Sequence, residues 1–329
     1  MFKFKITNDL NELKDDWNKL LTDSQTATVF QTPGYLSAWC DSFISDKNEI
    51  FLVGVYEGEK LIGLAPFRRV GDKITFLGTD RVGEKGDLVT DFGDIIAVSG
   101  REKEVWEGVV GEMRNLGIKE IELDYLREFS MSYKILSELG FRSTQMMDNG
   151  VPDVSPFLDL PKTYEEYLAG LSGKNRHELK RKQRRLEELG FKIVKSGNPT
   201  ENIHEFIRLH RESTPEKEKF MTDQMAKFFV DVVKNLSADN CVDIEFMEVN
   251  GVKVSATLSF LCHNQYWLYN SGFDRNFEFQ AVGLLLKANT IKIAIDLGCT
   301  KYSFLRGNER YKYDLGAGDE RLFKIQINF

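Results

Sequence analysis

Four side chains near the C-terminal end of the sequence are of types that can move protons. Carboxylates, tyrosine hydroxyls and lysine amines all act as general acids or bases when a site holds them in position. Each candidate follows a predicted strand, from Gln265 to Asn270 or from Lys301 to Leu305, and α/β sites commonly collect at strand ends. The candidate catalytic residues are Asp274, Glu309, Tyr311 and Lys312.

Each of these candidates also has a purely structural interpretation. Asp274 could close an Asx-type turn, with Gly272 nearby. The stretch RGNERYK could be a solvated polar turn, because Gly307 argues against a continuing strand. The sequence leaves both pairs of interpretations open. His263, in a predicted hairpin loop, is interpreted as a surface residue.

Between the two strands lies a segment that could bind a phosphate. The loop predicted from Ser271 to Ala281 leads into a helix predicted from about Val282 to Leu297. The first N–H groups of a helix lack partners, and its dipole is positive there, so an anion is favoured. Gly283 either lets that anion approach or lets the helix pack closely on the sheet. No Walker-type lysine precedes it, so the loop is not that of a P-loop NTPase.

A basic helical segment covers residues 163–190. Thr163 and Glu166 form a predicted capping box, and KNRHELKRKQRRLEELG continues the helix to Gly190. Residues 174–192 hold eight basic and three acidic side chains, a net charge of +5 within a chain of −7. If the helix is unbroken, Arg176 and Lys180 share one face. That face is either simply solvated or contacts a phosphate.

Composition excludes several classes of protein. The net charge of −7 and the pI of 5.4 argue against general nucleic-acid affinity. The four histidines and four cysteines show no metal-ligand spacing, and no Gly-x-Ser-x-Gly elbow is present, so we expect neither a metal site nor a serine hydrolase. No secretion signal and no apolar run of ~18 residues occur, so we expect a cytoplasmic protein with no membrane span.

The length of 329 residues predicts two domains. A proline-rich connector, DNGVPDVSPFLDLPK, divides residues 1–150 from residues 151–329. The halves resemble each other weakly. FLVGVYEGEKLIGLAPF matches EFMEVNGVKVSATLSF as a hairpin with a glycine turn, and LGIKEIELDYL matches LGCTKYSFLRG as a helix end, glycine and strand. A duplicated α/β domain fits this pattern, as does chance likeness between two ordinary α/β units.

The order of elements resembles the fold of the GNAT superfamily of N-acetyltransferases. Three stretches resemble its cellulose-biosynthesis acetyltransferase-like branch: GKNRHELKRKQRRLEELG, NSGFDRNFEFQAVGLLLKANTIKIA and FLRGNERYK. VFQTPGYLSAW and LIGLAPFRR look like the N-terminal half of the same branch, so the resemblance covers nearly the whole chain. In the usual GNAT phosphate loop, Gln/Arg-x-x-Gly-x-Gly/Ala, Gln280 and Gly283 match, whereas Leu285 replaces the last small residue.

The resemblance implies an α/β (α+β) fold of two tandem GNAT-like domains, each a mixed, mostly antiparallel sheet flanked by helices. The cofactor site is expected in the second domain, where two strands splay and the backbone from Leu268 to Ser271 faces the donor thioester. Arg306 is a candidate contact for the substrate. The candidate cofactor-binding residues are Tyr269, Ser271, Gln280, Ala281, Val282, Gly283 and Leu284, with Arg176 and Lys180 from the basic helix.

The expected activity is N-acyl transfer from acyl-CoA, with acetyl-CoA the first choice, to an amine of a small molecule or cell-envelope or polysaccharide precursor. Tyr311 would protonate the leaving thiolate. The same architecture occurs in Fem-type peptidoglycan ligases, so an aminoacyl-tRNA donor is one alternative, and only this alternative involves a nucleic acid. A non-catalytic binding protein with the GNAT fold is another. No DNA partner is expected, and the chain could be a monomer or a homodimer.

Overall fold

The computed structural model describes residues 2–25, 27–83, 86–148 and 150–329. It divides the chain into two compact units: unit 1 contains residues 1–154 and 320–329, and unit 2 contains residues 155–319. The predicted second domain, 151–329, therefore includes a last segment that the structure assigns to unit 1. Asn149, inside the predicted connector, lies outside the described residues.

Unit 1 is built on a mixed sheet in the order β1-β2-β3-β4-β6-β16, with β5 on β3 and β7 on β16. Its strands are β1 (Lys3–Thr7), β2 (Ile50–Glu57), β3 (Lys60–Val70), β4 (Lys73–Phe76), β5 (Ile96–Ala97), β6 (Glu120–Arg127), β7 (Arg142–Gln145), β8 (Met147–Asp148), β9 (Val151–Pro152) and β16 (Gly318–Asn328). Its helices are η1 (Leu10–Glu12), α1 (Lys14–Asp23), η2 (Val29–Gln31), α2 (Pro33–Phe43), η3 (Lys47–Glu49), α3 (Glu102–Asn115) and α4 (Met131–Glu138).

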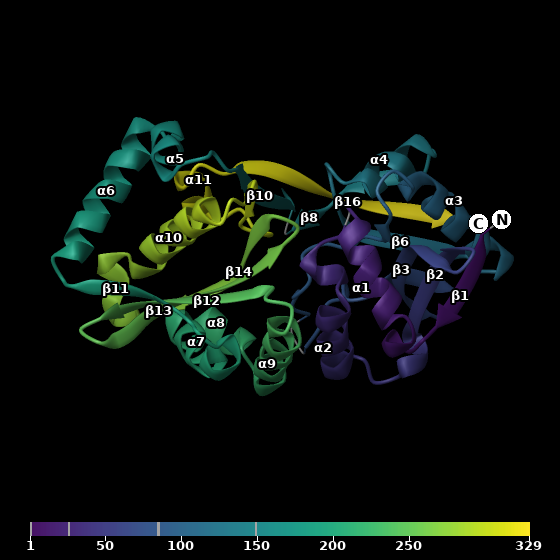
Figure 1. Cartoon of the computed structure of the whole chain (residues 1–329), viewed down its shortest axis with the longest axis horizontal. Helices are drawn as coiled ribbons and strands as arrows, with labels where there is room; N and C mark the ends of the chain where they lie inside the picture. Colours follow the sequence, from purple (N-terminus) through teal and green to yellow (C-terminus); the bar gives the residue numbers. More distant parts are fainter. Residues whose placement is uncertain (1, 26, 84–85, 149) are drawn as a thin grey trace. The chain divides into compact units, whose positions relative to one another are not determined.

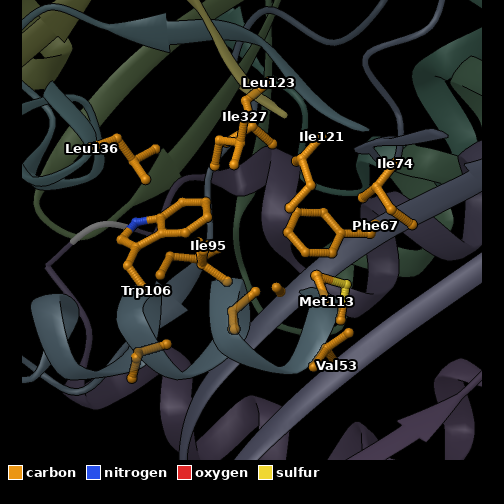
Figure 2. Packing of buried hydrophobic residues seen from close by; sticks show 14 of the residues in the cluster. Val53, Phe67, Ile74, Ile95, Trp106, Met113, Ile121, Leu123, Leu136 and Ile327 are labelled. Atoms are coloured by element: carbon orange, nitrogen blue, oxygen red, sulfur yellow. The ribbon is translucent and has the colours of Figure 1, made fainter. Parts of the chain in front are cut away.

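The core of unit 1 lies between this sheet and α3. The apolar positions of α3 recur at helical spacing, so Trp106 and Met113 fall on one buried face. Figure 2 shows these two side chains gathered with Phe67 and Ile121 from the strands. Ile327 of β16 belongs to the same cluster, so the end of the chain completes the core in which the N-terminal elements pack.

Unit 2 repeats the plan, with a sheet in the order β10-β15-β14-β13-β12-β11. Its strands are β10 (Val154–Asp159), β11 (Phe191–Lys195), β12 (Val242–Val249), β13 (Val252–Cys262), β14 (Gln265–Phe273) and β15 (Lys301–Ser303). Its helices are α5 (Tyr164–Gly170), α6 (Gly173–Glu187), α7 (Pro199–Ser213), α8 (Pro215–Phe220), α9 (Asp223–Ser237), η4 (Arg275–Gln280), α10 (Val282–Asp296) and α11 (Arg310–Asp314). In Figure 1, α7, α8 and α9 lie on one side of β12–β14, and α10 lies on the other.

The two sheets share one topology. In each, an antiparallel hairpin leads into a third strand, which pairs in parallel with a fourth across a helical crossover: β4 with β6 across α3, and β14 with β15 across α10. The hairpin turn of unit 2 has positive φ at Asn250 and Gly251, as a tight two-residue turn requires. The predicted tandem arrangement of mixed sheets flanked by helices is confirmed.

The ends of two predicted strands differ in the structure. β14 extends to Phe273 rather than ending at Asn270, because β13 continues to pair with it. β15 ends at Ser303 rather than at Leu305. The segment from Glu309 to Lys312, for which the sequence left two interpretations open, leads into α11, with Glu309 as its N-cap.

Candidate functional site

The pairing between the parallel strands β14 and β15 is short. It runs from Gln265 opposite Lys301 to Trp267 opposite Ser303, where β15 ends, whereas β14 runs on to Phe273. From Leu268 onward, β14 therefore has no strand partner on its β15 side, as the expected splay would require. We call the space on this side of β14, beyond Trp267 and Ser303, the strand opening.

β14 is irregular where it borders the strand opening. Its register with β13 shifts between Ser259 and Leu258, so that Tyr269 has no partner in the pairing. The Tyr269 ring packs at 5.4 Å from Phe229 and 4.8 Å from Phe260, centroid to centroid. Its side chain thus belongs to the packing against α9, and only its backbone borders the opening.

Lys312 holds together the segment that follows β15. Its side chain is buried, and Nζ donates to the carbonyls of Leu305 at 3.1 Å, Arg306 at 2.7 Å and Gly307 at 2.9 Å. It also pairs with Glu309 Oε2 at 2.9 Å. Because four oxygens already surround the ammonium, Lys312 is a positioning residue for this segment.

Glu309 and Tyr311 lie beside this lysine. Burial opposes ionisation of Glu309, but the charge of Lys312 outweighs burial and lowers the pKa of the carboxyl group. Burial raises the pKa of the Tyr311 hydroxyl, so this group stays protonated. The structure therefore brings together three of the four predicted catalytic residues, one an anion and one a proton donor.

Two further lysines approach the strand opening from opposite sides of the sheet. Lys217, on α8, donates from Nζ to the carbonyl of Ser271 on β14. Lys287, on α10, places Nζ 4.5 Å from the centroid of the Tyr311 ring. We call Lys217, Lys287, Lys312 and Glu309 the lysine cluster.

Burial makes both lysines unusually weak bases, and neighbouring positive charges add to this effect at Lys287. Burial lowers the pKa of Lys217 to about 8, partly offset by Glu309. Burial, together with the charge of Lys217, lowers the pKa of Lys287 to about 7. Each therefore exchanges its proton near neutral pH, whereas an exposed lysine stays charged.

The N-terminus of α10 lies next to this cluster. Ala281, its N-cap, is left-handed with φ of 58° and provides no side-chain cap. Gly283 is buried, and a Cβ there would lie 3.2 Å from the Phe273 ring and 3.8 Å from Lys287 Nζ. The absence of a side chain at Gly283 thus lets α10 pack closely against Phe273. It also leaves space between Lys287 Nζ and the first turn of α10. Gln280 Oε1, just before the helix, is buried with no hydrogen-bond partner among the described residues.

The basic helix α6 meets α10 through residues other than those predicted. Arg176 Nη1 donates to the carbonyl of Ala169, which ties α6 to the end of α5, and Lys180 is exposed. Instead, Lys174 and Lys182 line a pocket of about 120 Å³ that also contains Leu284 of the first turn of α10.

Asp274 lies apart from the other predicted catalytic residues. Its Oδ1 accepts a hydrogen bond of 2.9 Å from the backbone of Asn276 and caps η4, as in the Asx-turn interpretation. It lines an open pocket of about 470 Å³ together with charged residues of α7 and α8, including Arg208 and Arg211. Arg306, the candidate substrate contact, is partly buried after β15, and its carbonyl accepts from Lys312.

The sequence reasoning missed Lys217 and Lys287. Lys287 interrupts the apolar run Val282–Ala288, one turn after Gly283, and a charge among such neighbours could have indicated it. Nothing in the sequence distinguishes Lys217 from Lys219. No group of three or more His, Cys, Asp or Glu side chains that could hold a metal ion occurs among the described residues. Within the same residues, no helix is long and apolar enough to cross a membrane.

Comparison with known proteins identifies the fold. Residues 173–313 match the family model described as "Acetyltransferase (GNAT) domain". No curated protein sequence matches. Among solved structures, FemX is similar with a TM-score of 0.67 and 12% identity, covering 98% of this chain and 96% of its own.

Two other solved structures extend the likeness. L-PGS from Bacillus licheniformis has a TM-score of 0.58 and 10% identity over 94% of this chain and 90% of its own. A tandem GNAT protein from the clavulanic acid biosynthesis pathway has a TM-score of 0.50 and 11% identity over 100% and 98%. At these identities the likeness shows the fold, which is a tandem GNAT fold. The family match in unit 2 supports a transferase.

Proposed function

We propose that this chain is an N-acyltransferase that uses acyl-CoA, with acetyl-CoA the simplest donor, and a small-molecule or envelope-precursor amine as acceptor. The observation that carries the proposal is the strand opening, which lies beside a helix N-terminus without a side-chain cap. The free N–H groups of Val282, Gly283 and Leu284 suit a pyrophosphate. The unpaired edge of β14 suits the amide groups of the pantetheine.

The charges of the two units favour a donor site in unit 2. The corresponding helix of unit 1, α3, has Glu102 and Glu104 in its first turn, and Glu102 is buried. Carboxylates at a helix N-terminus already occupy its positive end and repel a phosphate. The first turn of α10 contains no acidic residue.

The reaction needs one attack and two proton movements. The acceptor nitrogen attacks the thioester carbonyl, the carbon–sulfur bond breaks, one proton leaves the nitrogen, and one reaches the thiolate sulfur. We assign the first proton to ionised Glu309 and the second to the Tyr311 hydroxyl. Lys312 holds their segment and Arg306 contacts the acceptor. Asp274, in its separate pocket, is the alternative base.

Binding of acetyl-CoA tests the donor. At 100 times its Kd, a ligand specific for the folded state should stabilise the protein by ~2.7 kcal/mol, seen as a rise in the thermal midpoint. Gly283→Leu should remove this rise, because its side chain would project towards Phe273 and Lys287. Gly111→Leu is the control, since no atom lies within 4 Å of a Cβ at that helical glycine. Lack of any response to acyl-CoA by the parent protein would contradict the proposal and favour a non-catalytic binding protein.

One observation favours an aminoacyl-tRNA donor instead. The side chains of Lys180, Arg184 and Arg185 on α6 are exposed, and Fem-type ligases share this architecture. Binding to tRNA would weaken steeply with salt, with a slope of roughly 0.7–0.9 per phosphate contacted. Replacing these three residues by glutamine should reduce that slope while leaving any acetyl-CoA response unchanged. Saturable, salt-sensitive tRNA binding without acyl-CoA binding would establish this alternative.

A further inference from the structure

Lys287 is a buried cation without an anionic partner in contact. Its residue is 9% exposed, and its ammonium group forms neither a hydrogen bond nor an ion pair with the described residues. Its contact is the face of the Tyr311 ring, a much weaker attraction than a carboxylate would give. A buried ammonium left in this way is costly, because water no longer solvates it.

The surroundings add to the positive charge. Lys217 and Lys312 increase the positive charge around Lys287. Within the lysine cluster, Glu309 is the one carboxylate that offsets this charge. Glu309 is already in contact with Lys312 at 2.9 Å, so Lys217 and Lys287 are left without a charged partner in contact. The positive end of α10 points to the same place.

The fold brings these two amines together through the strand opening. Lys217 comes from α8 on one side of the sheet and Lys287 from α10 on the other (Figure 1). A continuous sheet would separate them, but here β14 has no partner on its β15 side beyond Trp267. Gly283 supplies room, since the position of its absent Cβ lies 3.8 Å from Lys287 Nζ.

We propose that Lys217 and Lys287 form a binding site for an oxyanion, the carboxylate or phosphate group of a substrate, within the strand opening. An oxyanion there would accept hydrogen bonds from both amines and neutralise the excess charge. The lysine cluster by itself indicates that this site binds an oxyanion. The further statement that this oxyanion is part of the acyl donor or of the acceptor amine rests on the proposed function.

Anion binding should also be coupled to protonation. Without an anion, the pKa of Lys287 is lowered to about 7 by burial and by Lys217, whereas Glu309 works in the opposite direction. A bound anion favours the ammonium form, so the protein should take up a proton on binding near neutral pH. Binding should weaken as the pH rises through 7 to 8.

The test measures thermal midpoints with succinate, inorganic phosphate or inorganic pyrophosphate, against sodium chloride at equal ionic strength. A rise of ~2 °C or more is expected with at least one of them. Lys287→Met should abolish the rise and, without anion, should increase the midpoint, because it removes the uncompensated buried charge. Lys292→Met, on the same helix but paired with Asp296, should keep the response.

The outcomes are separable. A response to succinate alone identifies a carboxylate, and a response to both phosphates identifies a phosphate group. No response to any probe, or an equal response in Lys287→Met, would overturn the proposal. A lower midpoint for Lys287→Met without anion would do so as well, since it would mean that the lysine stabilises the fold. Small-anion binding without acetyl-CoA binding would contradict the proposed function and leave the anion site standing.

Discussion

Side chains of the same type in unit 2 have different roles, because the groups that they contact differ. Lys287 and Lys292 lie on one helix, yet Lys292 pairs with Asp296 on the surface and Lys287 is buried beside the strand opening. Lys312 is also buried, and three carbonyls and a carboxylate surround it. The lysine amine therefore has three roles here: Lys292 forms a surface ion pair, Lys287 is the proposed anion-binding group, and Lys312 holds a backbone segment in place.

His210 makes the same point for histidine. It is buried on α7, and its Nε2 lies 3.1 Å from Asn270 Oδ1 on β14. Burial, reinforced by the charge of Lys217, lowers its pKa to about 3. The imidazole therefore stays neutral at physiological pH.

Glu245 provides a prediction for the pH dependence of stability. It lies buried on β12 near Asp243, whose partner is Lys195 at 3.1 Å, and burial, followed by the charge of Asp243, raises the pKa of Glu245 to about 7. The folded state therefore binds more protons than the unfolded state between pH ~4.5 and ~7, and stability falls as the pH rises through this window.

Glu245→Gln should remove that loss. The variant should gain on the order of 2 kcal/mol over the parent protein between pH 4.5 and 7, measured by urea unfolding at several pH values. Glu248→Gln, on the same strand, is the control and should show no such trend. A parent protein that becomes more stable than Glu245→Gln as the pH rises would contradict the assignment.

At the scale of secondary-structure elements, the packing of β14 against α7 sets the position of β14, which forms one side of the strand opening. A Cβ on Gly272 would lie 2.4 Å from the backbone nitrogen of His210, so strand and helix backbones are in direct contact there. No flexible side chain can move away to make room. The glycine is therefore required for packing, not for an unusual φ.

Gly272→Ala should destabilise the protein by about 1–3 kcal/mol, because the added methyl group must push α7 away from the sheet. The measurement is the urea unfolding midpoint. Gly170→Ala, at the end of α5 with no atom within 4 Å of the new Cβ, should change stability by less than ~1 kcal/mol. Equal effects of the two substitutions would show that the close packing is not present in solution.

Across the whole molecule, the chain returns to its first unit at the end. Ile325 and Ile327 of β16 belong to the core formed by α3 and the strands of unit 1, and β16 pairs with β6. The order of the sequence therefore differs from the order of the units. Unit 1 is complete only after residues 320–329 have been synthesised.

A chain ending at Asp319 should lose the folded core of unit 1. It lacks most of β16, which pairs with β6 and β7, and two buried isoleucines worth several kcal/mol together. Near-ultraviolet circular dichroism and tryptophan fluorescence should report the loss, since Trp17, Trp39 and Trp106 lie in unit 1. A chain ending at Asn328 is the control. Native-like signals from the shorter chain would show that β16 is dispensable.

The sequence alone determined most of the local structure. Hydrophobic spacing and glycine turns placed the hairpin at Asn250-Gly251 and the start of α10 near Val282, because these signals act over a few residues. The family resemblance indicated the tandem GNAT fold and the region of the cofactor loop. It also included Glu309, Tyr311 and Lys312 among its candidates.

Only the tertiary structure decided what those side chains contact. Asp274 caps η4 and lines a separate pocket, and the Tyr269 ring packs against α9. The ammonium group of Lys312 donates its hydrogen bonds to backbone carbonyls. Lys217 and Lys287, distant in sequence, act on each other because β15 ends and leaves one side of β14 unpaired between them. Burial and charge coupling depend on such long-range neighbours, and no local pattern records them.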